Sequence, residues 1–432
     1  MPNSQINAAF PEKESNAPRF HYLDGLRGLA ALSVLLGHAF GLAASQDGSI
    51  SQSLPPLFAK CTRWMTNVHY AVAVFIVLSG YCLMLPVARA RDGRVPGGLF
   101  AFFKRRARRI LPAYYGALAC VLGLVTISRY LFKHTTETTV DASRENILTH
   151  LLLVHNLFQK WSIGLDAPMW SVALEWQIYF VFALVLLPIW RRYGIAWTAV
   201  AGCALGYLPI VVLPQGSNLY WTSPWCLGLF TFGMCAAMVT CSPRDQYRLA
   251  KNIVFQDGGL VLIAVGLVTL SVFKPAWLDA PYYWITDMFV GAFTALLILA
   301  CGREARGKWW HRAVVDGLQS NGAATLGAFS YSLYLVHYPV LLKMQYVMHQ
   351  YGFSESAQMV ILFLGGVPFC LCLAYVFHLV WERPFMPGRS LGANRKPEIA
   401  VPVGPDPMDA VSDSDEAKPL APFSTVINTP NP

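Results

Sequence analysis

Two ionisable side chains in the first apolar block of the chain could take part in chemistry. Arg27 and His38 are eleven residues apart in a stretch that is otherwise largely apolar. In an α-helix eleven residues rise about 16 Å and return to nearly the same face, so Arg27 and His38 share one face. Asp24 falls within about 40° of that face. One stripe thus carries a carboxylate, a guanidinium and an imidazole. A neutral imidazole can accept a proton, so His38 is a candidate general base for a hydroxyl group.

A structural interpretation of these residues stays open. Arg27 would then extend its charge to the membrane surface, and His38 would make a packing hydrogen bond. Polar groups inside a bilayer are costly and usually functional, which favours the chemical interpretation.

Two more candidate catalytic residues lie in later apolar blocks. Glu175 is a second acid or base, an orienter of His38, or a hydrogen-bonded lock between helices. His337 follows Ser330 by two helical turns and precedes Pro339, which is expected to kink the helix. The imidazole of His337 either faces a water-lined cavity or forms hydrogen bonds with neighbouring tyrosines.

Arginines near the start of the third block are candidate anion ligands. The stretch 105–109 holds four arginines, and planar guanidinium groups bind phosphates bidentately. A basic cluster at a helix end is also a common membrane anchor, and both interpretations can hold together.

The elements that must position these residues are membrane helices. Apolar residues make up 55% of the 432 positions, charged residues 13%, and mean hydropathy is +0.42, whereas soluble domains carry about 25% charged residues. Apolar blocks of this length predict an all-α, polytopic integral membrane helical bundle of about ten transmembrane helices. The expected spans are 26–44, 68–88, 107–128, 170–190, 194–213, 219–240, 255–273, 282–302, 324–348 and 357–381. Residues 147–158 are too short to span and are expected to be re-entrant or interfacial.

The distribution of basic residues predicts the orientation. With the amino terminus in the cytoplasm, 24 of the 33 Lys and Arg fall in inside segments and seven in outside segments, as the positive-inside rule requires. Both termini are then cytoplasmic. Residues 1–20 form a polar N-terminal segment, and 386–432, rich in proline, form a disordered tail. The net charge of +9 reflects this topology and anionic lipid rather than nucleic acid. The ten cysteines show no metal-binding spacing.

Six motifs resemble those of transmembrane acyltransferase family 3, the group that contains O-antigen acetylases. The first is residues 22–38, YLDGLRGLAALSVLLGH, in which the family requires an arginine and a histidine at the positions of Arg27 and His38. The others follow in family order: 75–81 (FIVLSGY), 105–115 (RRARRILPAYY), 170–179 (WSVALEWQIY), 330–339 (SYSLYLVHYP) and 382–385 (ERPF).

The resemblance implies a transmembrane acyltransferase domain over residues 21–385. It would transfer an acyl group, acetyl by expectation, from cytoplasmic acyl-CoA to a hydroxyl of an envelope or exported carbohydrate in a bacterial inner membrane. Arg27, Arg106 and Arg109 would bind the donor, His38, Glu175 and His337 would serve catalysis, and no metal would be needed. Expected partners are membrane lipid and the carbohydrate, and a homo-oligomer is compatible with the sequence. A proton-coupled transporter and an export scaffold are the alternatives.

Overall fold

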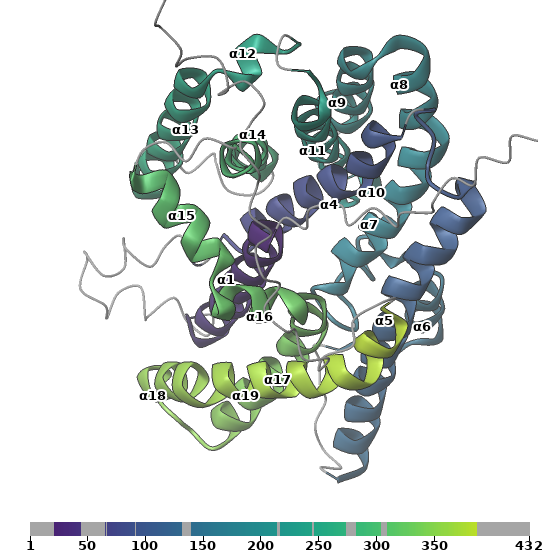
Figure 1. Cartoon of the computed structure of the whole chain (residues 1–432). Helices are drawn as coiled ribbons and strands as arrows, with labels where there is room; N and C mark the ends of the chain where they lie inside the picture. Colours follow the sequence, from purple (N-terminus) through teal and green to yellow (C-terminus); the bar gives the residue numbers. More distant parts are fainter. Residues whose placement is uncertain are drawn as a thin grey trace, which may run out of the picture. The chain divides into compact units, whose positions relative to one another are not determined.

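The computed structural model describes residues 21–44, 65, 67–90, 92–131, 140–213, 217–243, 246–273, 282–303 and 309–386. Within these residues every regular element is a helix (Figure 1), which confirms the predicted fold class. The expected cytoplasmic segments 1–20 and 386–432 lie outside the described residues except for Met386.

Nine helices in the described part are long and apolar enough to cross a membrane. Six are single elements: α1 (His21–Ala44), α4 (His69–Arg89), α5 (Gly98–Leu131), α9 (Ile195–Val212), α13 (Ile253–Phe273) and α14 (Tyr283–Cys301). Three are composite: α7 (Met169–Val181) with η3 (Phe182–Leu186) and α8 (Leu187–Tyr193), α10 (Asn218–Trp221) with α11 (Cys226–Cys241), and α18 (Glu355–Ile361) with η5 (Leu362–Gly366), α19 (Val367–Phe377), η6 (His378–Glu382) and η7 (Arg383–Phe385).

A tenth long helix, α17 (Ser330–Gln350), covers most of the expected span 324–348 and is more polar because it carries Ser332 and His337. All ten expected spans therefore coincide with helices. The remaining short elements are α6 (Arg144–Leu151), η2 (His155–Leu157), α12 (Arg248–Lys251), α15 (Trp309–Gln319) and α16 (Asn321–Ala328).

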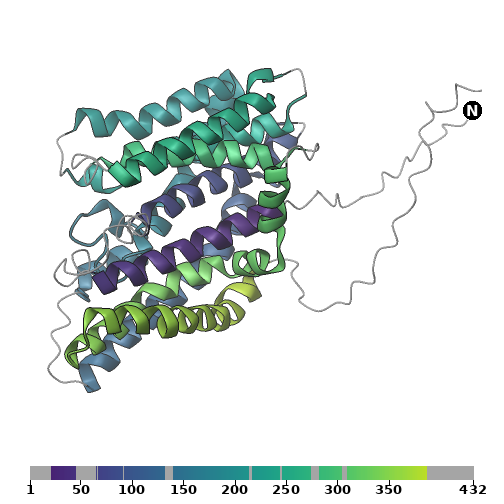
Figure 2. The ribbon, with the colours of Figure 1, turned by 90° about the vertical axis from the view of Figure 1, so that its left-hand side faces the viewer.

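Helices α1 and α4 lie at the centre of the helical unit. α1 packs against α4, α16 and α17, and α4 packs against α11 and α14. The side view shows the long helices lying side by side, with α1 between its neighbours (Figure 2). By contrast, only 17% of the α9 span and 11% of the α13 span is buried, so these two helices are peripheral and turn apolar side chains outward, as lipid contact requires.

Glycines allow α4 and α11 to touch backbone to backbone. A Cβ at Gly80 would overlap the carbonyl oxygen of Phe230, and one at Gly233 would overlap that of Val77. Small residues permit such close approach between membrane helices. The contact at Gly80 therefore serves helix packing.

Residues 140–168, ahead of α7, pack against the bundle. The imidazoles of His150 and His155 are fully buried and stack with ring centroids 3.7 Å apart. Tyr114 of α5 donates a hydrogen bond to the carbonyl oxygen of His150. Burial lowers the pKa of His150 to about 4 and that of His155 to about 3, where the neighbouring imidazole lowers it further.

Candidate active site

The side chain of Arg27 is held in place by two neighbours at one end of the bundle. Its Nη1 donates to Asp24 Oδ1 at 3.1 Å, one turn back on α1, and its Nη2 donates to Cys82 Sγ of α4 at 2.9 Å. The guanidinium is thereby held between α1 and α4 rather than extended along the helix surface. This arrangement leaves Arg27 on the wall of a cavity.

We call this cavity the arginine cavity. It has a volume of about 100 Å³ and is lined by residues of α1, α4, α5, α7 and α17, including Arg27, Ser79, Cys82, Arg106, Arg109, Glu175, Tyr179, Ser330, Tyr331 and Tyr334. All three arginines expected to bind the donor thus reach one cavity. Guanidinium groups that converge in this way suit an anionic ligand such as a phosphate.

Arg106 brings a further hydrogen-bond donor to the arginine cavity. Its guanidinium lies 5.9 Å from the ring centroids of both Phe102 and Tyr179, within the range of cation–π attraction. Its Nε is buried and, among the described residues, has no hydrogen-bond partner. Because an unpaired buried donor is costly, this nitrogen is suited to an oxygen atom of a ligand or water.

Glu175 belongs to the arginine cavity and not to the immediate surroundings of His38. Its Oε1 accepts a hydrogen bond from Tyr179 at 2.7 Å, one turn further along α7. The sequence placed Glu175 as an acid or base, as an orienter of His38, or as a lock. In the structure the hydrogen-bond partner of His38 is His337.

His38 and His337 form a direct pair between α1 and α17. The His38 Nδ1 and His337 Nε2 atoms are 2.9 Å apart, and the other nitrogen of His337, Nδ1, lies 2.9 Å from the carbonyl oxygen of Leu333. A carbonyl oxygen only accepts, so His337 Nδ1 carries a proton and, in the neutral ring, Nε2 accepts from His38 Nδ1–H. The tautomers follow from these partners.

These hydrogen bonds determine which nitrogen of His38 could accept a proton. With its proton on Nδ1, the neutral His38 ring keeps a lone pair on Nε2. His337 is 1% exposed and can stabilise the Nδ1–H of a charged His38 through the same hydrogen bond. A third group orients a catalytic histidine in a comparable way in hydrolase triads.

His38 lines a second cavity, which we call the aromatic cavity. It has a volume of about 310 Å³, at the lower end of the range of ligand pockets, about 300–1,000 Å³. Its walls come from α1, α4, the start of α7 and the segment before it, α10, the starts of α11 and α14, and α17. The aromatic lining consists of His38, His69, Trp170, Tyr220, Trp221, Trp225, Tyr283 and Tyr334.

A second imidazole in this cavity was missed by the sequence analysis. His69 Nδ1 lies 2.6 Å from Asp287 Oδ1 of α14, and Trp225 Nε1 donates to Asp287 Oδ2 at 2.9 Å. Asp287 lies inside an expected span, so a carboxylate within an apolar block was the signal that could have revealed it. Its partners come from distant parts of the sequence.

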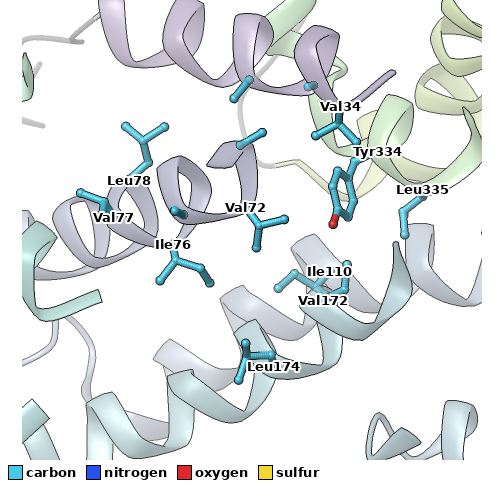
Figure 3. Packing of buried hydrophobic residues seen from close by; sticks show 14 of the residues in the cluster. Val34, Val72, Ile76, Val77, Leu78, Ile110, Val172, Leu174, Tyr334 and Leu335 are labelled. Atoms are coloured by element: carbon cyan, nitrogen blue, oxygen red, sulfur yellow. The ribbon is translucent and has the colours of Figure 1, made fainter. Parts of the chain in front are cut away.

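Val72 and Tyr334 line both cavities. Tyr334 points from α17 toward α7, near Val172 and Ile110 (Figure 3). Its hydroxyl lies 2.7 Å from that of Ser171, which also lies 3.1 Å from the carbonyl oxygen of Pro168. Because that carbonyl only accepts, Ser171 donates to it and Tyr334 donates to Ser171. The two cavities therefore adjoin at Val72 and Tyr334.

The helix directions place the cavities toward opposite ends of the bundle. Arg27 is near the start of α1 and His38 is about 16 Å further along it. His69 begins α4, which returns toward the Arg27 end and finishes at Arg89. Among the described residues, no group of three or more His, Cys, Asp or Glu could hold a metal ion, and the absence of a metal requirement stays a prediction.

Residues 20–379 match a family described as an acyltransferase domain. BcsY of Komagataeibacter xylinus, provisionally named a membrane-bound transacylase, is 26% identical over 343 residues, which cover 76% of this chain and 74% of the relative. YrhL of Bacillus subtilis, provisionally named a peptidoglycan O-acetyltransferase, is 24% identical over 334 residues, covering 74% of this chain and 48% of the relative.

A Staphylococcus aureus protein (strain COL), provisionally named an O-acetyltransferase, is 24% identical over 340 residues, covering 74% of this chain and 50% of the relative. The alignments with the Bacillus and Staphylococcus relatives thus cover only about half of those proteins. No solved structure matches this chain.

Proposed function

This chain belongs to the acyltransferase domain family, as its six motifs predict, and from that premise we propose that it is a membrane O-acyltransferase. Its arginine cavity holds the donor and its aromatic cavity holds the acceptor, and the two substrates meet where these cavities adjoin at Val72 and Tyr334. The pair formed by His38 and His337, at 2.9 Å, is the observation that carries this proposal. It supplies an oriented base on the wall of the larger cavity.

The donor is an acyl-CoA, acetyl-CoA by expectation, held by the arginine cavity. The cavity of about 100 Å³ is far smaller than coenzyme A, so it holds only the phosphates nearest the pantetheine arm, and the acyl-bearing arm continues past Val72 and Tyr334 to His38. Arg109 is exposed, while Arg27 and Arg106 lie deeper. The rise of about 16 Å between Arg27 and His38 is the length scale of an extended pantetheine arm.

The acceptor is a carbohydrate hydroxyl that enters the aromatic cavity. His38 Nε2 removes the hydroxyl proton while the oxygen attacks the thioester carbonyl carbon. The carbon–sulfur bond then breaks, and the thiolate leaves as coenzyme A after taking the proton from the His38 imidazolium. A base positioned in this way contributes about 10²- to 10⁴-fold to the rate. Glu175, beside the arginines, is proposed to set the charge of the donor cavity.

Acyl transfer from a cytoplasmic donor to an acceptor outside the membrane requires a protein whose site is reached from both sides. We place the arginine cavity toward the cytoplasm, where acyl-CoA is made, and the aromatic cavity toward the outside of a bacterial inner membrane. The basic residues near Arg27 and Arg89 agree with this orientation under the positive-inside rule.

Purified full-length protein in lipid nanodiscs, given labelled acetyl-CoA and a methyl glycoside, tests the proposal. We expect transfer of the label, and a loss of about 10²- to 10⁴-fold in kcat for His38→Ala. His349→Ala replaces an exposed histidine of α17 and serves as the matched control. Transfer by His38→Ala at the wild-type rate would refute the base, and solute flux without acyl consumption would identify a transporter.

A further inference from the structure

The aromatic cavity contains an imidazole for which the proposed reaction has no use. His69 of α4 lines the cavity together with His38 of α1. Its ring lies between two aromatic neighbours, with centroids 4.6 Å from that of Tyr70 and 5.2 Å from that of Tyr283. A single base suffices for acyl transfer to a hydroxyl, so His69 requires another explanation.

The hydrogen bonds of His69 fix which of its nitrogen atoms remains for a ligand. Asp287 Oδ1 accepts from His69 Nδ1 at 2.6 Å, so Nδ1 is turned away from the cavity toward α14. The opposite nitrogen, Nε2, is left on the cavity side of the ring. The side chain of His69 is 25% exposed, whereas that of Asp287 is 5% exposed.

Asp287 is itself held by a third helix. Trp225, at the start of α11, donates its indole N–H to Asp287 Oδ2 at 2.9 Å. Both oxygens of the carboxylate therefore have partners from different helices. Carboxylates inside a membrane protein are costly and usually functional. Helices α4, α11 and α14 already pack on one another through apolar contacts and glycines, so the network is not needed merely to join them.

The two imidazoles have equivalent arrangements. His38 commits Nδ1 to His337, and His69 commits Nδ1 to Asp287. Each keeps Nε2 for the cavity, and the broad aromatic faces of Trp170 and Trp221 line the same space. A ligand that fits this lining has an apolar face for the indoles and at least two hydroxyl groups for the imidazoles.

We propose that His69, fixed by Asp287 and Trp225, determines acceptor specificity by binding a second hydroxyl of a pyranose or similar polyol ring. The hydroxyl at His38 is then the one acylated, and a ring with a single hydroxyl is held poorly. This proposal rests on the proposed function in one respect, because it takes His38 as the base in the same cavity. His69 is a positioning residue for the acceptor and not a base.

The magnitude follows from one hydrogen bond to a charged or strongly polarised group. Such a bond contributes roughly 1.5–3 kcal/mol, and each 1.36 kcal/mol is a factor of ten. Loss of the His69 contact is therefore expected to weaken pyranoside binding about 10- to 160-fold. The effect should appear in the acceptor KM and Kd rather than in kcat.

The test compares methyl α-glucopyranoside with cyclohexylmethanol, which has a similar ring and a single hydroxyl. Equilibrium binding and acyl transfer are measured for the full-length protein in nanodiscs. His69→Leu should lose the preference for the glucopyranoside, taken as the ratio of kcat/KM for the two alcohols, by about 10- to 160-fold. His69→Gln, which can still hydrogen-bond, should recover part of the preference. His349→Leu is the matched control.

Equal affinity of the wild-type protein for both alcohols would overturn the assignment, as would an unchanged preference in His69→Leu. An equal loss for both alcohols with a lower melting temperature would mark His69 as a purely structural residue and also overturn it. His38→Ala separates this proposal from the proposed function, because it should lose acyl transfer while its remaining binding still prefers the glucopyranoside through His69. Binding that depends on His69, together with transfer that does not depend on His38, would uphold this inference and refute the base.

Discussion

Replacing His337 by leucine isolates the contribution of the histidine pair. The side chain is 1% exposed and leucine is of similar size, so the packing of α17 is largely kept while the acceptor for His38 Nδ1–H is lost. His38 Nε2 stays available, but the charge that develops on the ring has lost its partner. The variant should therefore bind both substrates and turn over slowly.

The magnitude follows from the 2.9 Å hydrogen bond between His38 Nδ1 and His337 Nε2. In the transition state this bond involves a charged imidazolium, and hydrogen bonds to charged groups contribute roughly 1.5–3 kcal/mol. At 1.36 kcal/mol for each factor of ten, kcat should fall about 10- to 160-fold. The KM values for donor and acceptor should change little.

The assay is steady-state transfer of labelled acetyl groups, run for His38→Ala, His337→Leu and the double variant. If His337 acts through His38, the double variant should be no slower than His38→Ala alone, because effects of residues that act as a unit are not additive. A melting temperature close to that of the wild type controls for misfolding. Additive losses, or a loss confined to KM, would refute the relay.

Three further outcomes are expected. Arg27→Lys keeps the charge but loses the planar fork, so KM for acyl-CoA should rise about tenfold with kcat unchanged in donor titrations. Gly80→Val would overlap the Phe230 backbone and should lower the melting temperature and the yield of folded protein, whereas Gly266→Val on peripheral α13, whose Cβ position is open, should not. The low pKa values of His150 and His155, about 4 and 3, mean that unfolded chains bind more protons below about pH 6.5. Melting temperature should therefore fall as pH drops from 6.5 toward 4, less steeply in a His155→Phe variant, and a pH-independent melting temperature would contradict this.

The membrane helices could be predicted from the sequence because hydropathy and span length depend only on local composition. Each of the ten expected spans coincides with a helix, and the shared face of Arg27 and His38 follows from helical periodicity alone. The gathering of Arg106 and Arg109 beside Arg27 was also expected, since all three lie near helix ends on one side. These are properties of single helices and of their alternating direction.

Contacts between helices could not be predicted in the same way. The sequence left open whether His38 would meet Glu175, and helix rotation brings His337 to it instead. The hydrogen bonds among His69, Asp287 and Trp225 join three helices. Local sequence patterns do not predict contacts between residues so far apart in the chain. The carboxylate of Asp287 inside an apolar block was visible, but its partner was not.

Transfer across a sealed bilayer tests the central claim most directly. Proteoliposomes with one protein orientation would receive labelled acetyl-CoA on the face that carries Arg27 and Arg109, with methyl glucopyranoside enclosed on the opposite face. The wild-type protein is expected to label the enclosed glycoside, and His38→Ala is expected to leave it unlabelled. Labelling that occurs only when both substrates share one face, or that persists without His38, would contradict a single site joining two cavities.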